Sequence, residues 1–158
     1  MAKEKNLYYA REAYDAVCTA LDEMDWSYQR DDEKLMVSFG VNGEDIPITV
    51  VIACNLDLQF LQLMSLLPFN APSYRMTEVA SSICVINYRL AVGNFDLSLD
   101  DGTIMFKLNS SFRETLISTE LVHSLIYLTC STVDKSNGDL LALCSGDMTL
   151  KDILEKYS

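Results

Sequence analysis

Basic side chains are scarce in this sequence. Its 158 residues include 12 Lys and Arg against 23 Asp and Glu, which leaves a net charge of −11. Proteins that bind a phosphate backbone do so through clustered Lys and Arg, and here only Lys3 and Lys5 lie close together. We therefore expect no nucleic-acid partner.

Glycine is also scarce, and the motifs that depend on it are missing. The chain has no G-x-G-x-x-G, no G-K-[ST] and no G-x-S-x-G, so the sequence predicts neither a nucleotide-binding loop nor the nucleophile turn of common hydrolases. The six glycines fall at predicted turns and helix ends. We expect them to serve the fold.

There is only one histidine, His123, with Glu120 and Tyr127 one helical turn away on either side. A histidine beside a carboxylate can act as a general base, but neighbours at this spacing occur on every helix, and no nucleophile accompanies the three. We expect a partly buried or surface histidine. No catalytic residue is predicted, and the chain is expected not to be an enzyme.

Metal-binding patterns are absent as well. The five cysteines have no paired-ligand spacing, so we expect small buried thiols kept reduced in a cytoplasm; they are Cys18, Cys54, Cys84, Cys130 and Cys144. The acidic groups at 22–25 and 31–33 lack the ligand order of a calcium loop, and a solvated acidic rim is expected instead. No metal or cofactor is predicted.

Long uninterrupted apolar runs are missing too. Residues 46–69 contain a single charge, Asp57, but Pro47, Pro68 and three amide side chains interrupt them, which favours a sheet over a spanning helix. The first residues lack the apolar core of a signal peptide. We expect a cytoplasmic protein with no membrane partner.

What the sequence does contain is enough apolar material for a core. Hydrophobic residues make up 49% of the chain, and a chain of this length can bury about 68–70% of its unfolded surface without a metal or disulfide. No repeat or linker divides it. The sequence predicts one domain over residues 1–158.

Helical periodicity predicts four helices. Apolar residues recur every three or four positions over 7–24, over 76–90 after a capping Ser73, and from about Glu114 to 145, with a break near Asn137-Gly138; Thr149 begins a short last helix. Gly93 is expected to end the second helix. Residues 56–67 fit a strand or a helix, and 68–72 are expected to break the chain.

Two hairpins follow from turn sequences and face patterns. With Asn42-Gly43 at the first tip, the pairs are Phe39 with Ile46, Val37 with Ile48 and Leu35 with Val50. With Asp101-Gly102 at the second, they are Leu99 with Ile104, Leu97 with Phe106, Phe95 with Leu108 and Asp96 with Lys107. The order helix, strands, helix, β-hairpin, helices predicts an α+β fold, an antiparallel sheet with helices packed on it.

One face of this predicted sheet has no assigned cover. Met36, Val51 and Met105 point away from the Leu35, Val37 and Phe39 side, alongside Ser38, Thr49 and Ser98. The face is too mixed for a second core and rather apolar for open water. Either the terminal helices of the chain cover it, or it binds a partner or a second copy; we predict binding.

Residues 85–108 combine a helix ending at Asn87, a short link to Gly93, a strand led by Phe95, an acidic tip with Gly102 and a returning strand. This segment, with 66–69 and 132–147, resembles the YbjN family. The resemblance implies a type III secretion chaperone-like fold, a strand over 55–66 and the label of a bacterial sensory transduction regulator. It marks Asn87, Gly93, Phe95 and Gly102 as structural residues.

We therefore expect a non-enzymatic cytoplasmic regulator that acts by binding protein, with a homodimer as one form. The alternative is a chaperone that binds an extended segment of a secreted client protein, which the uncovered sheet face would serve. A small-molecule enzyme ranks third.

Overall fold

A computed structural model describes residues 1–158. The helices are α1 (Ala2–Glu23), α2 (Met76–Arg89), α3 (Thr119–Ser145) and α4 (Leu150–Lys156), and a 3-10 turn, η1 (Ser73–Arg75), precedes α2. The strands are β1 (Gln29–Asp31), β2 (Met36–Asn42), β3 (Pro47–Asn55), β4 (Phe60–Asn70), β5 (Asn94–Leu97) and β6 (Thr103–Ser111). This order confirms the predicted α+β class.

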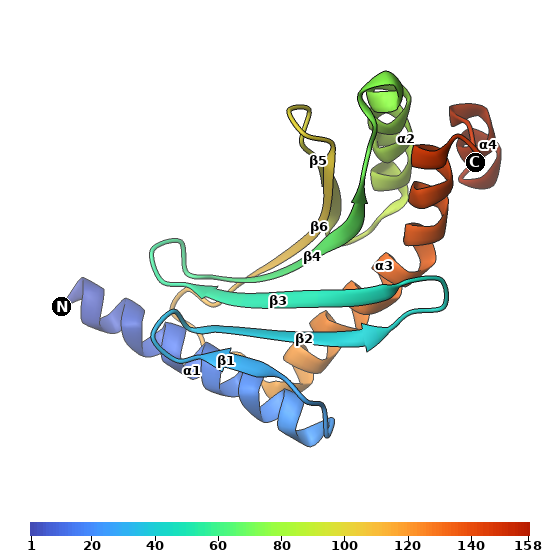
Figure 1. Ribbon diagram of the computed structural model, residues 1–158. Coiled ribbons are helices and arrows are strands. Elements are labelled where there is room, and N and C mark those ends of the chain that lie inside the picture. Colours follow the sequence, from blue (N-terminus) through green and yellow to red (C-terminus); the bar gives the residue numbers. More distant parts are fainter.

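The six strands form one antiparallel sheet in the order β1-β2-β3-β4-β6-β5. The first four strands follow one another along the chain, and the β5–β6 hairpin joins through β6 after α2 has crossed. Figure 1 shows a strongly curved sheet with α1 and α3 behind it and with α2 and α4 beside its upper part. The helices thus cover one side of the sheet.

A single core of 35 buried residues fills the space between sheet and helices. Alternate strand residues supply the sheet side: Val37, Ile52, Leu63 and Leu108 lie opposite one another across four strands, and none is more than 2% exposed. Each such side chain contributes about 1.5–3 kcal/mol on burial. Because buried residues alternate along each strand, the side chains between them lie on the other side of the sheet, outside the core.

The first hairpin has a longer tip than predicted. Phe39 pairs with Val50, and Val37 pairs with Ile52, so residues 43–46 form a four-residue loop in place of a two-residue turn. The backbone N–H of Glu44 donates to Asp134 on α3 at 2.7 Å, which holds this longer loop against the helix. The shift is by an even number of residues, so the faces stay as predicted.

The second hairpin differs in the same way. Phe95 pairs with Phe106 and Leu97 with Ile104, and the N–H of Gly102 donates to the carbonyl of Ser98 at 2.9 Å, which closes a four-residue tip. The carbonyl of Gly102 also accepts the N–H of Ala71 at 2.8 Å. That contact with the end of β4 explains why the tip is larger than its Asp-Gly sequence predicts.

The prediction of a strand over 55–66 is correct only in part. Residues 56–59 turn the chain between β3 and β4, with Gln59 in the left-handed region and its side-chain amide donating to the Leu56 carbonyl at 2.6 Å. The predicted break at 68–72 is also wrong at its start. A register shift between Leu66 and Asn70 accommodates Pro68, so β4 continues to Asn70.

Helix α3 begins later than predicted and has no break. Glu114 has a φ of 55°, which is incompatible with a right-handed helix, and Ser118 caps the helix by accepting the N–H of Leu121. Asn137 and Gly138 lie within the helix. A Cβ on Gly138 would crowd the carboxylate of Asp45, so glycine here lets the β2–β3 loop approach.

The ends of the other helices follow the sequence less closely than their cores. Ser73 begins the 3-10 turn, and its side chain caps neither that turn nor α2. Helix α2 ends at Arg89, and Gly93 lies beyond it with a φ of 75° at the entry to β5. Thr149 does begin the last helix, through a reciprocal capping pair with Asp152.

The four residues marked by the family resemblance have structural contacts. The side-chain amide of Asn87 donates to the carbonyl of Phe95 at 2.9 Å and accepts its N–H at 2.8 Å, which joins the end of α2 to β5. Phe95 is buried against Phe106. Gly93 and Gly102 both have positive φ values.

Candidate functional site

The side of the sheet that faces away from the helices has no element of the chain packed on it. We call it the open face. Its side chains are half-buried or exposed throughout, because no helix packs on them. They are Met36, Ser38 and Gly40 on β2, Thr49, Val51 and Ala53 on β3, Gln62, Met64 and Leu66 on β4, Asp96 on β5, and Met105 and Lys107 on β6. The alternative in which the terminal helices cover this face is wrong, since α3 and α4 lie on the other side.

An apolar band crosses the open face. It consists of Met36, Val51, Met64, Leu66 and Met105, in which Val51 lies opposite Met64 and Leu66 lies opposite Met105. Leu66 is 56% exposed. Three of the seven methionines of the chain are in this band, and unbranched methionine side chains adapt to differently shaped partners. The band can therefore bury apolar side chains of another molecule.

Charged residues border the band in internal pairs. The ammonium of Lys107 lies 2.6 Å from a carboxylate oxygen of Asp96, and the other Asp96 oxygen accepts from Asn94 at 2.6 Å. The predicted pairing of Asp96 opposite Lys107 is wrong, because Met105 lies directly opposite Asp96 and Asn94 lies opposite Lys107. The ion pair joins diagonal neighbours. At the far edge, Lys34 lies 3.5 Å from Asp31.

Two shallow hollows lie beside β1 at one edge of the open face. One of about 260 Å³ reaches Met36 and Val51, and one of about 430 Å³ reaches Gly40 and Thr49. Both are lined mainly by residues of β1, β2 and β3, and in neither is a serine or threonine hydroxyl hydrogen-bonded to a carboxylate or an imidazole. Their shape suits the side chains of a polypeptide better than an enclosed small molecule.

The single histidine has a different neighbour from the one that the sequence indicated. His123 is on α3, and its Nε2 atom lies 3.1 Å from a carboxylate oxygen of Glu23 at the end of α1. The carboxylate of Glu120 is held by the first turn of the helix instead, where hydrogen bonds from its own backbone N–H and from Ser118 lower its pKa. No nucleophile lies in this group.

The acidic clusters are divided among separate structural contacts. Asp22 accepts the hydroxyl of Tyr28 at 2.9 Å, and Asp32 accepts the hydroxyl of Tyr14 and the Nε–H of Arg30, each at 2.7 Å. These last two bonds lower the pKa of Asp32. No group of three or more His, Cys, Asp or Glu side chains lies close enough to hold a metal ion.

The five cysteines are unpaired, but they are not all buried as expected. Cys84 is exposed because it lies on the outer side of α2, and Cys130 is half-buried on α3. Burial raises the pKa of Cys54 to about 12 and that of Cys130 to about 11. Thiols with such values are poor nucleophiles at neutral pH.

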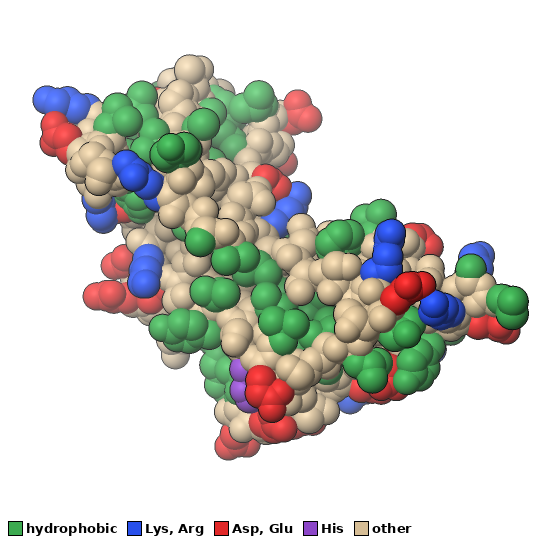
Figure 2. All heavy atoms as spheres, turned by 180° about the vertical axis from the view of Figure 1, so that it is seen from behind, with side chains coloured by type: hydrophobic (Ala, Val, Ile, Leu, Met, Phe, Trp, Pro, Cys, Tyr) green, Lys and Arg blue, Asp and Glu red, His purple; other side chains and the backbone are tan.

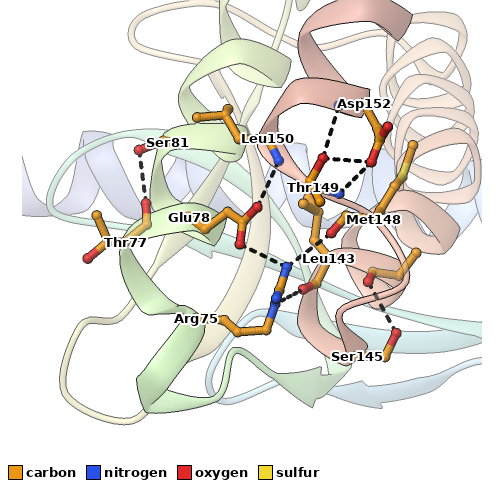
Figure 3. A network of polar contacts seen from close by, with 11 residues as sticks. Arg75, Thr77, Glu78, Ser81, Leu143, Ser145, Met148, Thr149, Leu150 and Asp152 are labelled. Carbon is orange, nitrogen blue, oxygen red and sulfur yellow. Dashed lines mark hydrogen bonds and ion pairs between the residues drawn. The ribbon is translucent and has the colours of Figure 1, made fainter.

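A polar network that the sequence did not indicate joins η1, α2 and the start of α4 (Figure 3). The Nε–H of Arg75 donates to the carbonyl of Leu143 at 2.6 Å, and its terminal nitrogen donates to the carbonyl of Met148 at 3.0 Å. The same nitrogen lies 2.9 Å from Glu78, whose other oxygen accepts the N–H of Leu150 at 2.9 Å. Arg75 is only 17% exposed, so this network is structural.

Hydrophobic side chains also reach the surface on the helical side (Figure 2). On α3 they include Leu121, which is 42% exposed, and Leu128, which is 36% exposed. They lie on the side opposite the open face. This second apolar region gives a matched comparison for any test of the open face.

Comparison with known proteins identifies relatives of the chain. Residues 13–144 match the family model of YbjN, described as "Putative bacterial sensory transduction regulator". No curated protein matches the chain in sequence. No helix is long and apolar enough to cross a membrane.

Two solved structures are similar in fold. The crystal structure of YbjN, "a putative transcription regulator from E. coli", has a TM-score of 0.57 at 10% identity and covers 80% of this chain and 92% of that chain. The structure of the HopA1-SchA chaperone-effector complex has a TM-score of 0.49 at 16% identity, with 85% of this chain and 94% of that chain covered. At 10% identity the likeness to the YbjN structure concerns the fold alone.

Proposed function

The chain belongs to the YbjN family, and from that premise we propose that it is a non-enzymatic regulator that binds another protein through the open face of its sheet. The observation that supports the proposal most directly is the apolar band, five partly exposed side chains on a sheet face with no helix over it. Contiguous exposed apolar surface of this kind is typical of interaction sites.

The remaining features favour binding over catalysis. The histidine and the acidic clusters have structural neighbours, and three of the cysteines are buried. In the two hollows beside β1, no serine or threonine hydroxyl is hydrogen-bonded to a base. Five unpaired cysteines also favour a reducing compartment. The proposed setting is therefore the cytoplasm.

The test compares the double variant Met36→Lys/Met105→Lys with the wild-type chain. Each lysine places a charge in the apolar band, and burying an unpaired charge against a partner is costly. We expect the variant to lose a specific partner in affinity capture from a lysate of the source organism, with the partner identified by mass spectrometry. Circular dichroism should show an unchanged fold, since both positions lie outside the core.

The matched control is Leu121→Lys/Leu128→Lys on the helical side, which should keep the partner. Loss of the partner in the control but not in the band variant would place the interface on α3 and contradict the proposal. Light scattering on the same samples tests a homodimer, whose mass should fall to that of the monomer only in the band variant.

The identity of the captured protein distinguishes the regulator from the chaperone. A regulator should retain signalling or housekeeping proteins, whereas a chaperone should retain one secreted client. An enzyme would instead show ligand-dependent melting in a metabolite screen, which Glu120→Gln or His123→Ala should abolish.

A further inference from the structure

The outer edge of β2 is only half covered. Strand β1 is three residues long and pairs with Met36, Val37 and Ser38. Figure 1 shows β1 alongside only one part of β2, whose other end continues beyond it toward the β2–β3 loop. The residues from Phe39 to Asn42 therefore have a strand neighbour on one side alone, namely β3.

The direction of the backbone groups at this edge follows from the ladder. The N–H of Cys54 donates to the carbonyl of Leu35 at 3.0 Å, which makes these two residues a hydrogen-bonded pair. Hydrogen-bonded pairs alternate along an antiparallel ladder, so Phe39 and Val41 bond to β3, whereas the N–H and C=O groups of Gly40 and Asn42 point outward. None of the backbone bonds outside the helices and strands uses them.

This edge also lacks the usual protection. Exposed strand edges commonly carry charged side chains, proline or a bulge, which prevent pairing with another chain. Residues 39–42 are Phe, Gly, Val and Asn, and Gly40 is exposed. The other edge strand, β5, carries Asp96 in an ion pair with Lys107.

Space for another backbone lies beside the same residues. The hollow of about 430 Å³ is bounded by Ser27, Tyr28 and Gln29 on one side and by β2 and Thr49 on the other. There the chain that leads into β1 diverges from β2. This space therefore lies directly beside the outward backbone groups of Gly40.

We infer that an extended segment of a partner polypeptide adds to the sheet at this edge, with its backbone bonded to Gly40 and Asn42. This inference rests on the proposed function, in which the chain binds protein. Outward N–H and C=O groups on alternate residues match an extended backbone, whereas a helix has already used its own backbone groups. Alternate side chains of the added strand would contact the open face near Thr49.

The probe is a library of random heptapeptides displayed on phage and selected on the wild-type chain. We expect the synthetic form of a selected peptide to bind at least 10-fold more weakly to Gly40→Pro/Asn42→Pro, because proline removes the two outward N–H donors without touching the bonds to β3. Gly40→Ala keeps the donor, and its Cβ would meet nothing closer than the Ile48 carbonyl at 3.8 Å. This control should bind as the wild type does.

Hydrogen exchange of the wild-type chain gives a second measurement that needs no folded variant. The amides of Gly40 and Asn42 should exchange rapidly in the free chain and slowly with the peptide bound, whereas that of Val41 should be slow in both. N-methylation of alternate peptide residues should abolish binding in one of the two sets only.

Three results would overturn the inference. The first is a library that yields no binder. The second is a peptide that loses affinity for Met36→Lys/Met105→Lys but not for the proline variant, which would leave the proposed function intact and reject the edge. The third is a wild-type dimer that the proline variant converts to a monomer, which would make a second copy of the chain the occupant.

Discussion

Replacement of Arg75 by alanine should loosen the attachment of α4 to the rest of the molecule. The guanidinium donates to two carbonyls, those of Leu143 near the end of α3 and Met148 in the following turn, and it pairs with Glu78 on α2. The last carbonyls of a helix have no partner within it. Alanine would leave both carbonyls without their donor in a largely buried position.

The magnitude follows from these three contacts. A hydrogen bond to a charged group contributes about 1.5–3 kcal/mol, but 17% exposure of the Arg75 side chain lets water replace part of the loss, and the partly exposed pair with Glu78 adds at most about 1 kcal/mol. We expect Arg75→Ala to lower the free energy of unfolding by about 2–4 kcal/mol. For a chain of this size that corresponds to a fall in Tm of about 4–16 °C.

The assay is urea unfolding and thermal melting of the wild type, Arg75→Ala and Arg75→Lys. Lysine offers a point charge in place of the planar fork, so it should restore only part of the stability. Hydrogen exchange should become faster first in α4. Arg75 pairs with Glu78, and Glu78 accepts the first N–H of that helix. Equal stability of all three chains, or equal quickening across the sheet, would refute this reasoning.

Two further predictions concern glycine and pH. Gly102→Ala should lower the free energy of unfolding by about 2–4 kcal/mol, because Gly102 has a φ of 76° and a Cβ would clash with the Ala71 carbonyl. Gly40→Ala should change it by no more than about 0.5 kcal/mol in the same urea assay. Equal losses in the two variants would contradict the prediction. Bonds from Tyr14 and Arg30 lower the pKa of Asp32 in the folded state, so their contribution should be complete above the unfolded value of about 3.9 and lost as the pH falls through the lower folded value. The Tm difference between the wild type and Asp32→Asn should therefore shrink below about pH 4, and a constant difference down to pH 2 would show that the carboxylate is unimportant.

The sequence predicted those parts of the fold that depend on local periodicity. The prediction that Val37, Phe39 and Phe95 lie on the core side of the sheet was correct, because apolar alternation fixes which side of a strand enters the core. The predicted strand register was wrong at both hairpins. Tip length depended on Asp134 and Ala71, which lie far away in the sequence and contact the loops only after folding.

The candidate site was predictable in outline for the same reason. Alternation placed Met36, Val51 and Met105 on one face, but it gave no means of deciding whether helices cover that face. Met64 and Leu66 were missed because residues 56–67 also fit a helix. No pattern in the sequence distinguishes Arg75 as the residue that bonds to the end of α3, since the network joins elements about seventy positions apart.

Because α3 lies behind the sheet and comes late in the chain, we expect folding to be delayed during synthesis. Helix α1 leaves the ribosome first, yet it packs on α3, more than a hundred residues later in the chain. At about 5–20 residues per second, that interval lasts about 5–20 s, and for all of it the apolar side of β2, β3 and β4 has no complete cover. Nascent chains that end before residue 119 should therefore be sensitive to protease and should bind general folding factors, whereas the released full chain should do neither.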